Sequence, residues 1–159
     1  MPLDSRPAVL RKAGADDAAA LTRLFLASRA AAMPYLARVH SDEATLAWMT
    51  HVVLPGTDVR VAETHEDGDV RIAGFLSLDG SELEHLYIDP GLRRRGIGSL
   101  LLAEAKEAGP DGLTLYTFQR NTGARAFYER HGFTAVAFDD GSRNEENEPD
   151  VRYRWAPGA

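Results

Sequence analysis

The chain has 159 residues, 44% of them hydrophobic and 26% charged, which fits one globular domain with a substantial core. It contains no cysteine, and this excludes disulfides, thiolate metal sites and cysteine nucleophiles. The net charge of −6 opposes non-specific binding to nucleic acid, and no apolar run reaches the length of about 18 residues that a membrane span needs. We therefore expect a single cytoplasmic domain over residues 1–159, without a nucleic-acid or membrane partner.

The periodicity of apolar residues predicts a strand, two helices, three strands, and then a helix, a strand, a helix and two strands. A carboxylate of Asp16 or Asp17 would cap the first helix, and Pro55–Gly56 would stop the second. The expected elements lie at about residues 8–12, 16–32, 42–53, 59–65, 72–78, 83–88, 96–108, 113–118, 122–131, 133–138 and 151–155.

Turn residues at 66–69 and 79–81 join the three central strands into an antiparallel meander. The helix that follows Ile88 leads to a further strand, which indicates a parallel crossover. The predicted fold class is therefore α/β (α+β), with a mixed, mostly antiparallel sheet of about six to seven strands and about four helices.

The densest basic cluster of this acidic chain is Arg93, Arg94 and Arg95, directly before Gly96-Ile97-Gly98-Ser99. Glycines allow close approach of the backbone, the free amides at a helix start attract anions, and arginines add charge-assisted hydrogen bonds to phosphate. The segment lacks the Gly-Lys-Ser/Thr of a nucleotide P-loop and has Leu101 where a dinucleotide fingerprint needs its third glycine. These residues therefore suit the pyrophosphate of another ligand.

The wider pattern resembles the GCN5-related N-acetyltransferases (GNAT). Its first part is Leu86-Tyr87-Ile88-Asp89-Pro90 followed by Arg93-x-x-Gly96-Ile97-Gly98-x-x-Leu101-Leu102, which is similar to the acetyl-CoA-binding motif of that family. Its second part comprises Asn121, Ala124, Ala126-Phe127-Tyr128-Glu129-Arg130 and Gly132-Phe133. The resemblance is specific from about Glu82 to Phe133, and it implies a single-domain fold with acetyl-CoA as acyl donor and no metal.

The resemblance also implies roles for individual residues. The backbone of Leu86, Tyr87 and Ile88 would pair with the pantetheine arm as an added strand does. Asn121 would contact the pantetheine region beside Ala124, and Tyr128 would stand near the thioester sulfur. The pyrophosphate would be bound by Arg93, Arg94, Arg95, Gly96, Ile97, Gly98 and Ser99.

Transfer to an amine benefits from a base, because only about one alkylamine in a thousand is neutral at pH 7. Strand alternation would place Glu82 and Glu84 on one face of the strand that leads to the cofactor, and His85 on the other. The family often uses a glutamate of this strand; Glu82 matches by spacing and Glu84 is the alternative. Both could instead be ordinary surface residues, and His85 could be a base or a packing residue.

Tyr128 is the candidate acid for the departing thiolate. A thiol pKa near 8.5 makes proton transfer from a tyrosine with a pKa of about 10 slightly uphill, so that a hydrogen bond to the sulfur is an alternative role. A purely structural role in the core is the third.

The acceptor site of the family lies between the first two helices and the late strands. This places Met33, Tyr35 and the acidic loop 139–150, with Glu145 and Glu146, among the candidate substrate residues. An acidic rim would attract a cationic small-molecule or peptide amine, although the loop could also be merely solvated. The predicted function is an acetyl-CoA-dependent N-acetyltransferase that acts by direct attack in a ternary complex. A non-catalytic acyl-CoA sensor is the alternative, and a homodimer is compatible with the fold.

Overall fold

The computed structural model describes residues 8–93 and 95–158, so that Arg94 of the predicted anion loop lies outside the described residues. A seven-stranded sheet with the order β1-β2-β3-β4-β5-β7-β6 forms the centre of the molecule. All neighbouring pairs are antiparallel except β4 and β5, which confirms the predicted mixed sheet and its parallel crossover. The strands are β1 (Val9–Lys12), β2 (Asp58–Glu66), β3 (Asp69–Asp79), β4 (Glu82–Ile88), β5 (Leu113–Phe118), β6 (Thr134–Asp139) and β7 (Asp150–Trp155).

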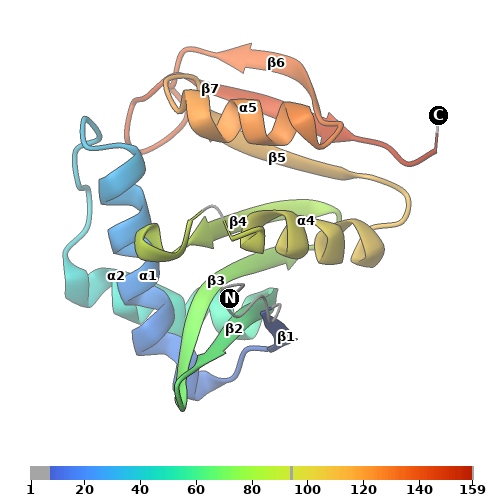
Figure 1. The fold of residues 1–159 in the computed structure, drawn as a ribbon. Helices are drawn as coiled ribbons and strands as arrows, with labels where there is room; N and C mark the ends of the chain where they lie inside the picture. Colours follow the sequence, from blue (N-terminus) through green and yellow to red (C-terminus); the bar gives the residue numbers. More distant parts are fainter. Residues whose placement is uncertain (1–7, 94, 159) are drawn as a thin grey trace.

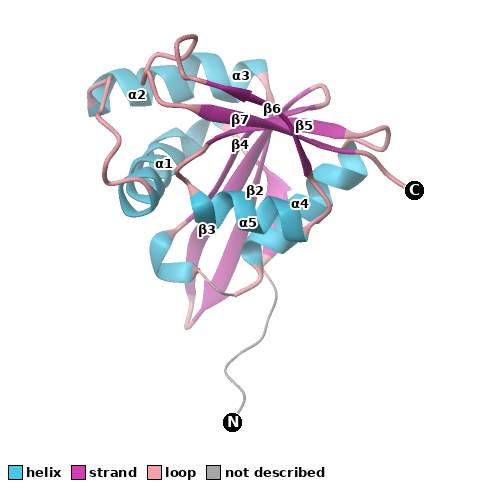
Figure 2. Cartoon of the chain, turned by 90° about the horizontal axis from the view of Figure 1, so that it is seen from above, coloured by secondary structure: helices cyan, strands magenta, loops and turns pink. Residues whose placement is uncertain are grey.

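Helices cover both faces of this sheet. The longer ones confirm the predicted positions and are α1 (Ala18–Ala32), α2 (Asp42–Trp48), α4 (Ile97–Ala108) and α5 (Thr122–Arg130), with a short α3 (Leu54–Gly56) after α2. Figure 2 shows α4 and α5 on one side of the strands and α1 to α3 on the other. Two hydrophobic clusters match these layers, since Leu101 and Tyr153 belong to one, and Phe25 and Phe75 to the other.

Of two local predictions about the first helices, one was wrong. A 3₁₀ turn precedes α1, and the carboxylate of Asp17 binds the amide of Gly14 and the guanidinium of Arg11 instead of capping the helix. The other, that Pro55–Gly56 stops the second helix, was confirmed, because α2, a π-helical turn at Met49–Val53 and α3 follow one another without a break and the helical chain ends at Gly56.

A β-bulge in β4 has consequences for the site. Leu83 pairs with Leu78 and His85 pairs with Ser77, so that Glu84 has no partner residue on β3. Leu83 consequently packs in the α4-side cluster, whereas His85 packs against Phe25 of α1 on the opposite face. The prediction that regular alternation aligns Glu82 with Glu84 and turns His85 away from both was therefore wrong, because a bulge adds a residue and shifts the faces of the strand.

Between β4 and β5 the ladder contains a single registered pair, Glu82 with Thr114, at the start of both strands. The amide of Thr114 also donates to the carbonyl of Ser81. Beyond this point the strands diverge, and Figure 1 shows α1 at the open end of the divergence. The edge of β4 from the bulge to Ile88 therefore lacks a strand partner among the described residues on its β5 side.

Gly74 on β3 holds the end of β4 in place. A Cβ at this position would lie 2.8 Å from Cδ1 of Ile88 and 2.9 Å from the carbonyl oxygen of Tyr87. Because the second atom belongs to the β4 backbone, we expect Gly74→Ala to lower the free energy of unfolding by about 1–3 kcal/mol, the usual cost of overpacking. Gly56→Ala is the control, since a Cβ there meets no atom within 4 Å. Urea denaturation measures both, and equal stabilities would contradict the role of Gly74.

Candidate active site

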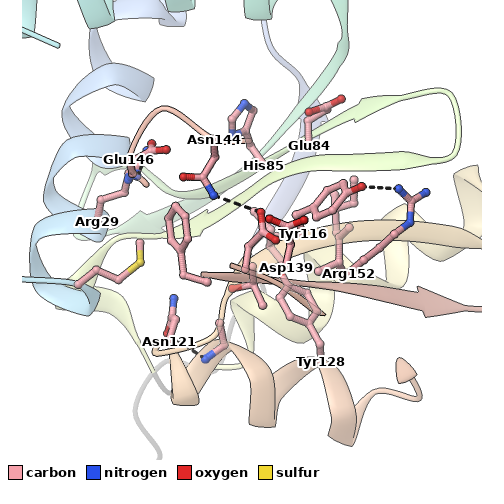
Figure 3. A pocket seen from close by; sticks show the side chains of 18 of the residues that line it. Arg29, Glu84, His85, Tyr116, Asn121, Tyr128, Asp139, Asn144, Glu146 and Arg152 are labelled. Atoms are coloured by element: carbon pink, nitrogen blue, oxygen red, sulfur yellow. Dashed lines mark hydrogen bonds and ion pairs between the residues drawn. The ribbon is translucent and has the colours of Figure 1, made fainter. Parts of the chain in front are cut away.

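A pocket of about 530 Å³ occupies the divergence between β4 and β5 (Figure 3). Its walls come from both faces of the sheet, with Arg29 and Met33 from the α1 segment and Asn121, Ala124 and Tyr128 from the α5 segment. The loop between β6 and β7 closes a further side with Asn144 and Glu146. A ligand in this position would therefore lie in a gap of the sheet and contact residues from both of its faces.

The β4 residues Leu83 to Tyr87 line the pocket along the unpaired edge of the strand. Backbone N–H and C=O groups at such an edge can accept an extended, amide-containing ligand as an additional strand. This observation fits the arm of coenzyme A, which carries two amides. Of the residues predicted to pair with that arm, Leu86 and Tyr87 line the pocket, whereas Ile88 does not and packs against the α4-side cluster.

The start of α4 has the features of an anion site. Gly96 is the N-cap with a φ of 77°, a left-handed conformation that favours glycine. The amides of Ile97, Gly98 and Ser99 have no acceptor within the helix, as is general for a first turn. Gly98 has a packing role, because a Cβ there would lie 3.2 Å from the ring of Phe127 and separate α4 from α5.

The arginines before α4 differ in their contacts. Arg95 forms an ion pair of 2.5 Å with Glu66 of the β2–β3 hairpin, while the side chain of Arg93 is exposed. Arg95 is therefore paired, whereas Arg93 has no ion-pair partner among the described residues.

Two residues of the second motif line the pocket from α5. The side chain of Asn121 accepts a hydrogen bond from the amide of Ala124 at 3.2 Å and so caps the helix. Its amide group can still donate toward the pocket. Tyr128 is buried, and no hydrogen bond links its hydroxyl to another described residue. Burial raises the pKa of Tyr128 well above its usual range, and the neighbouring Tyr87 adds to the rise.

The structure separates the two candidate glutamates. Glu84, at the bulge, lines the pocket, and burial together with Glu82 and Asp79 raises the pKa of its carboxyl. Glu82 does not line the pocket; it accepts the hydroxyl of Thr114 at 2.5 Å and lies 3.9 Å from Arg152. The geometry therefore favours Glu84 over Glu82 for contact with a reacting amine.

His85 lines the pocket from an aromatic cluster. Its ring lies 5.1 Å from that of Trp48 and 6.0 Å from that of Phe25, both in edge-on contact. Its Nδ1 atom is buried and has no hydrogen-bond partner among the described residues. Burial lowers the pKa of His85 to about 4, and the charge of Arg29 acts in the same direction. The imidazole is therefore neutral at pH 7.

Most acidic groups predicted to form the substrate rim are already paired. Glu146 lines the pocket and binds Arg29 at 3.2 Å, whereas Glu145 lies outside the lining and contacts His40 at 2.9 Å. Met33 lines the pocket, but Tyr35 stacks under the guanidinium of Arg120 at 3.8 Å and does not. Arg120 in turn forms an ion pair with the buried carboxylate of Glu148. These pairs tie loop 139–150 to the α1–α2 segment.

The sequence did not indicate several other lining residues. Arg29 comes from the end of a helix that has no motif. The hydroxyl oxygen of Tyr116, on the exposed face of β5 and β7, accepts a hydrogen bond from the guanidinium of Arg152 at 2.6 Å. Strand alternation could have placed Tyr116 and Phe118 on one face, but only the register between β5 and β7 brings Arg152 beside Tyr116. The described chain holds no group of three or more residues suited to bind a metal ion, and no described helix combines the length and apolarity needed to cross a membrane.

Comparison with known proteins identifies the family. Residues 55–135, just over half of the chain, match the model of the acetyltransferase (GNAT) domain. The chain therefore belongs to the GNAT acetyltransferase family. The matched segment contains β4, the anion site at α4 and the helix that carries Asn121 and Tyr128.

Curated relatives match over part of their length. A peptidyl-lysine N-acetyltransferase, YjaB of Salmonella typhimurium, is 40% identical over 80 residues, which cover 50% of this chain and 52% of the relative. A mycothiol acetyltransferase of Clavibacter sepedonicus is 42% identical over 81 residues, or 46% of this chain and 27% of the relative. The chain thus spans about half or less of the length of these relatives. Their names refer to two different molecules, a peptide lysine and mycothiol.

Solved structures match over nearly the whole chain. Apo-form YjaB of Escherichia coli has a TM-score of 0.76 at 23% identity, and the match covers 95% of this chain and 98% of the YjaB chain. YncA of Salmonella typhimurium, solved with acetyl-CoA, has a TM-score of 0.66 at 20% identity, and the match covers 96% of this chain and 95% of the YncA chain. At these identities the likeness establishes the fold.

The neutral His85 makes stability dependent on pH. Because its folded pKa of about 4 lies below the ordinary value of 6.5, its contribution is complete above pH 6.5 and is lost as the pH falls toward 4. The loss is at most about 3 kcal/mol. We expect His85→Phe, which preserves an aromatic ring, to lose less stability than the wild type between pH 7 and pH 5 in denaturant titrations. His51→Gln, at an exposed histidine, should behave as the wild type, and equal acid sensitivity of His85→Phe would contradict the prediction.

Proposed function

We propose that this protein is an N-acetyltransferase that uses acetyl-CoA as acyl donor and a primary amine as acceptor, in a ternary complex with direct attack. The observation that carries the proposal is the pocket between β4 and β5, which is lined by an unpaired strand edge, together with the unpaired amides at the start of α4. Membership of the GNAT family and the acetyl-CoA bound to YncA support the same donor.

The donor would occupy the α4–α5 side of the pocket. The first-turn amides of α4 and the exposed Arg93 suit the pyrophosphate, through unpaired N–H groups and a positive charge. The β4 edge and the free amide hydrogens of Asn121 suit the pantetheine amides. When bound, acetyl-CoA supplies the activated acetyl group, and the chain positions the thioester between Tyr128 and β4.

Reaction requires a neutral amine. Its nitrogen forms a bond to the thioester carbon, the carbon–sulfur bond breaks, and the amine proton passes to a base. Glu84 lies on the wall of the pocket, and the rise of its pKa makes its ionised form a better base than an ordinary glutamate. We assign this role to Glu84, directly or through a water molecule. His85 has too low a pKa to take the proton from an ammonium group effectively.

The leaving sulfur gains negative charge, and Tyr128 is the group on the pocket wall that can stabilise it. Because burial raises the pKa of Tyr128, complete proton transfer to a thiolate with a pKa near 8.5 is clearly uphill. A hydrogen bond from the hydroxyl to the sulfur is the role that this environment supports, and solvent then completes the protonation.

The acceptor would enter from the α1 side. The pocket lining contains four carboxylates and three guanidinium groups, so that its balance is only weakly negative (Glu84, Asp139, Glu146 and Asp150 against Arg29, Arg143 and Arg152). This weak balance favours an amine whose single positive charge approaches Glu84. A peptide lysine and a small amine both carry such a charge. Lysine peptides are the first acceptors to test, because YjaB is named a peptidyl-lysine N-acetyltransferase.

The decisive experiment measures release of free thiol from acetyl-CoA with lysine peptides and small primary amines as acceptors. We expect amine-dependent thiol release and a matching acetylated product in the mass spectrum. Calorimetric titration with CoA is run in parallel. Binding of CoA without turnover for any amine would favour the sensor function, and absence of CoA binding would refute the proposal.

Tyr128→Phe tests the hydrogen bond to sulfur. The substitution removes one hydroxyl that forms no hydrogen bond with another described residue, so we expect an unchanged melting temperature and CoA affinity. Turnover should fall at least about tenfold at saturating substrates, as is usual when a transition-state donor is lost. Unchanged turnover would exclude this role.

Glu84→Gln and Glu82→Gln form a matched pair for the base. Since the base must be ionised, activity should fall as the pH drops through the raised pKa of Glu84. We expect Glu84→Gln to lower kcat about 100-fold and to abolish this acid limb of the pH profile. Glu82→Gln should leave kcat nearly intact, because glutamine still accepts the Thr114 hydroxyl. It should move the acid limb to lower pH, because the charge of Glu82 contributes to the raised pKa of Glu84. The reverse pattern would transfer the role to Glu82.

A further inference from the structure

A contact between α4 and α5 lies directly at the proposed pyrophosphate site. The hydroxyl of Ser99, in the first turn of α4, is 3.0 Å from Nε2 of His131, the residue that follows α5. The other ring nitrogen, Nδ1, is 2.8 Å from the carbonyl oxygen of Phe127. The imidazole ring is also packed 4.5 Å from the ring of Phe127, so that its orientation is fixed.

These contacts determine where the protons lie. A carbonyl oxygen can only accept, so Nδ1 of His131 carries a hydrogen and, in the neutral ring, Nε2 has a lone pair. Ser99 therefore donates its single hydroxyl hydrogen to Nε2. In this state the hydroxyl presents only lone pairs to an anion at the start of α4.

An anion at Ser99 reverses this arrangement. If the hydroxyl hydrogen turns to a phosphate oxygen, the lone pairs of Ser99 and of Nε2 face each other at 3.0 Å unless Nε2 gains a proton. A protonated His131 donates to Ser99, which then donates to the phosphate. The resulting imidazolium also places a positive charge beside the anion.

We propose that His131 is a positioning residue for the acyl donor, which takes up one proton when the pyrophosphate binds and thereby turns Ser99 into a phosphate donor. This inference rests on the proposed binding of CoA at α4. The proton comes from solvent, no covalent bond changes, and release of CoA returns the proton.

The charged surroundings of His131 permit this step. From α4, the ammonium group of Lys106 contacts the backbone carbonyl of His131 at 2.5 Å, and burial lowers the pKa of that lysine. On α5, Arg130 precedes His131 in the chain, whereas Glu129 binds the hydroxyl of Tyr153. Lys106 and Arg130 are positively charged, and a bound pyrophosphate would offset their charges when His131 gains a proton.

Calorimetric titration with CoA in buffers of different ionisation enthalpy counts the protons taken up on binding. We expect up to one more proton for the wild type than for His131→Gln near pH 7.5. The wild-type affinity should also fall by up to about tenfold per pH unit above neutrality, by linkage. Dephospho-CoA is the second probe, since it lacks the phosphate monoester whose own pKa near 6 contributes to proton exchange.

His131→Gln keeps an N–H donor for Ser99 that does not titrate, so its affinity should vary less with pH and exceed that of the wild type at pH 8.5. Ser99→Ala should likewise lose the additional proton uptake, and His51→Gln, at an exposed histidine, should retain it. Equal proton uptake by the wild type and His131→Gln, with CoA bound in both, would refute this inference alone. Absence of CoA binding to the folded wild type would refute it together with the proposed function.

Discussion

The loss of pairing between β4 and β5 is the constraint on which the site depends. The backbone N–H and C=O groups of an inner strand normally form hydrogen bonds with both neighbouring strands. An inner strand that lacks one partner leaves donors and acceptors unpaired along that edge. Here β4 is an inner strand that joins β5 through one registered pair and then leaves it. The pocket is the direct result of this divergence, and its peptide-like wall can bind an amide chain without any particular side chain.

Two features of the sequence stabilise the divergence. The bulge at Glu84 adds a residue to β4 and turns His85 into the aromatic cluster of α1 and α2. The close approach of β3 at Gly74 holds the far end of β4 against its other neighbour. The strand is thus fixed by packing on its faces and by β3, so that its second edge remains free for a ligand.

Much of the fold could be predicted from the sequence, because the period of the apolar residues differs between strands and helices. Glycine and proline also mark most of the boundaries between these elements. The donor half of the site could also be predicted, since its residues lie within two local motifs, at α4 and α5. The bulge could not, because nothing in the run from Ser81 to Ile88 distinguishes an added residue from regular alternation. The position of Arg29 likewise depends on contacts between segments more than 100 residues apart, such as its pair with Glu146.

The acceptor half illustrates how composition can mislead. The loop 139–150 is rich in acidic residues, and alone it suggests an attractive field for cations. In the folded chain Glu146 and Glu148 form ion pairs with Arg29 and Arg120, and Glu145 contacts the ring of His40, so that part of this charge is already neutralised within the protein. Two carboxylates of the pocket lining, Glu84 and Asp150, have no ion-pair partner among the described residues. Asp150 accepts a hydrogen bond from the side chain of Asn144, whereas Glu84 lies at the bulge and accepts none from a described side chain. Attraction of the acceptor and removal of its proton would therefore fall to one carboxylate, which the bulge itself places on the pocket wall.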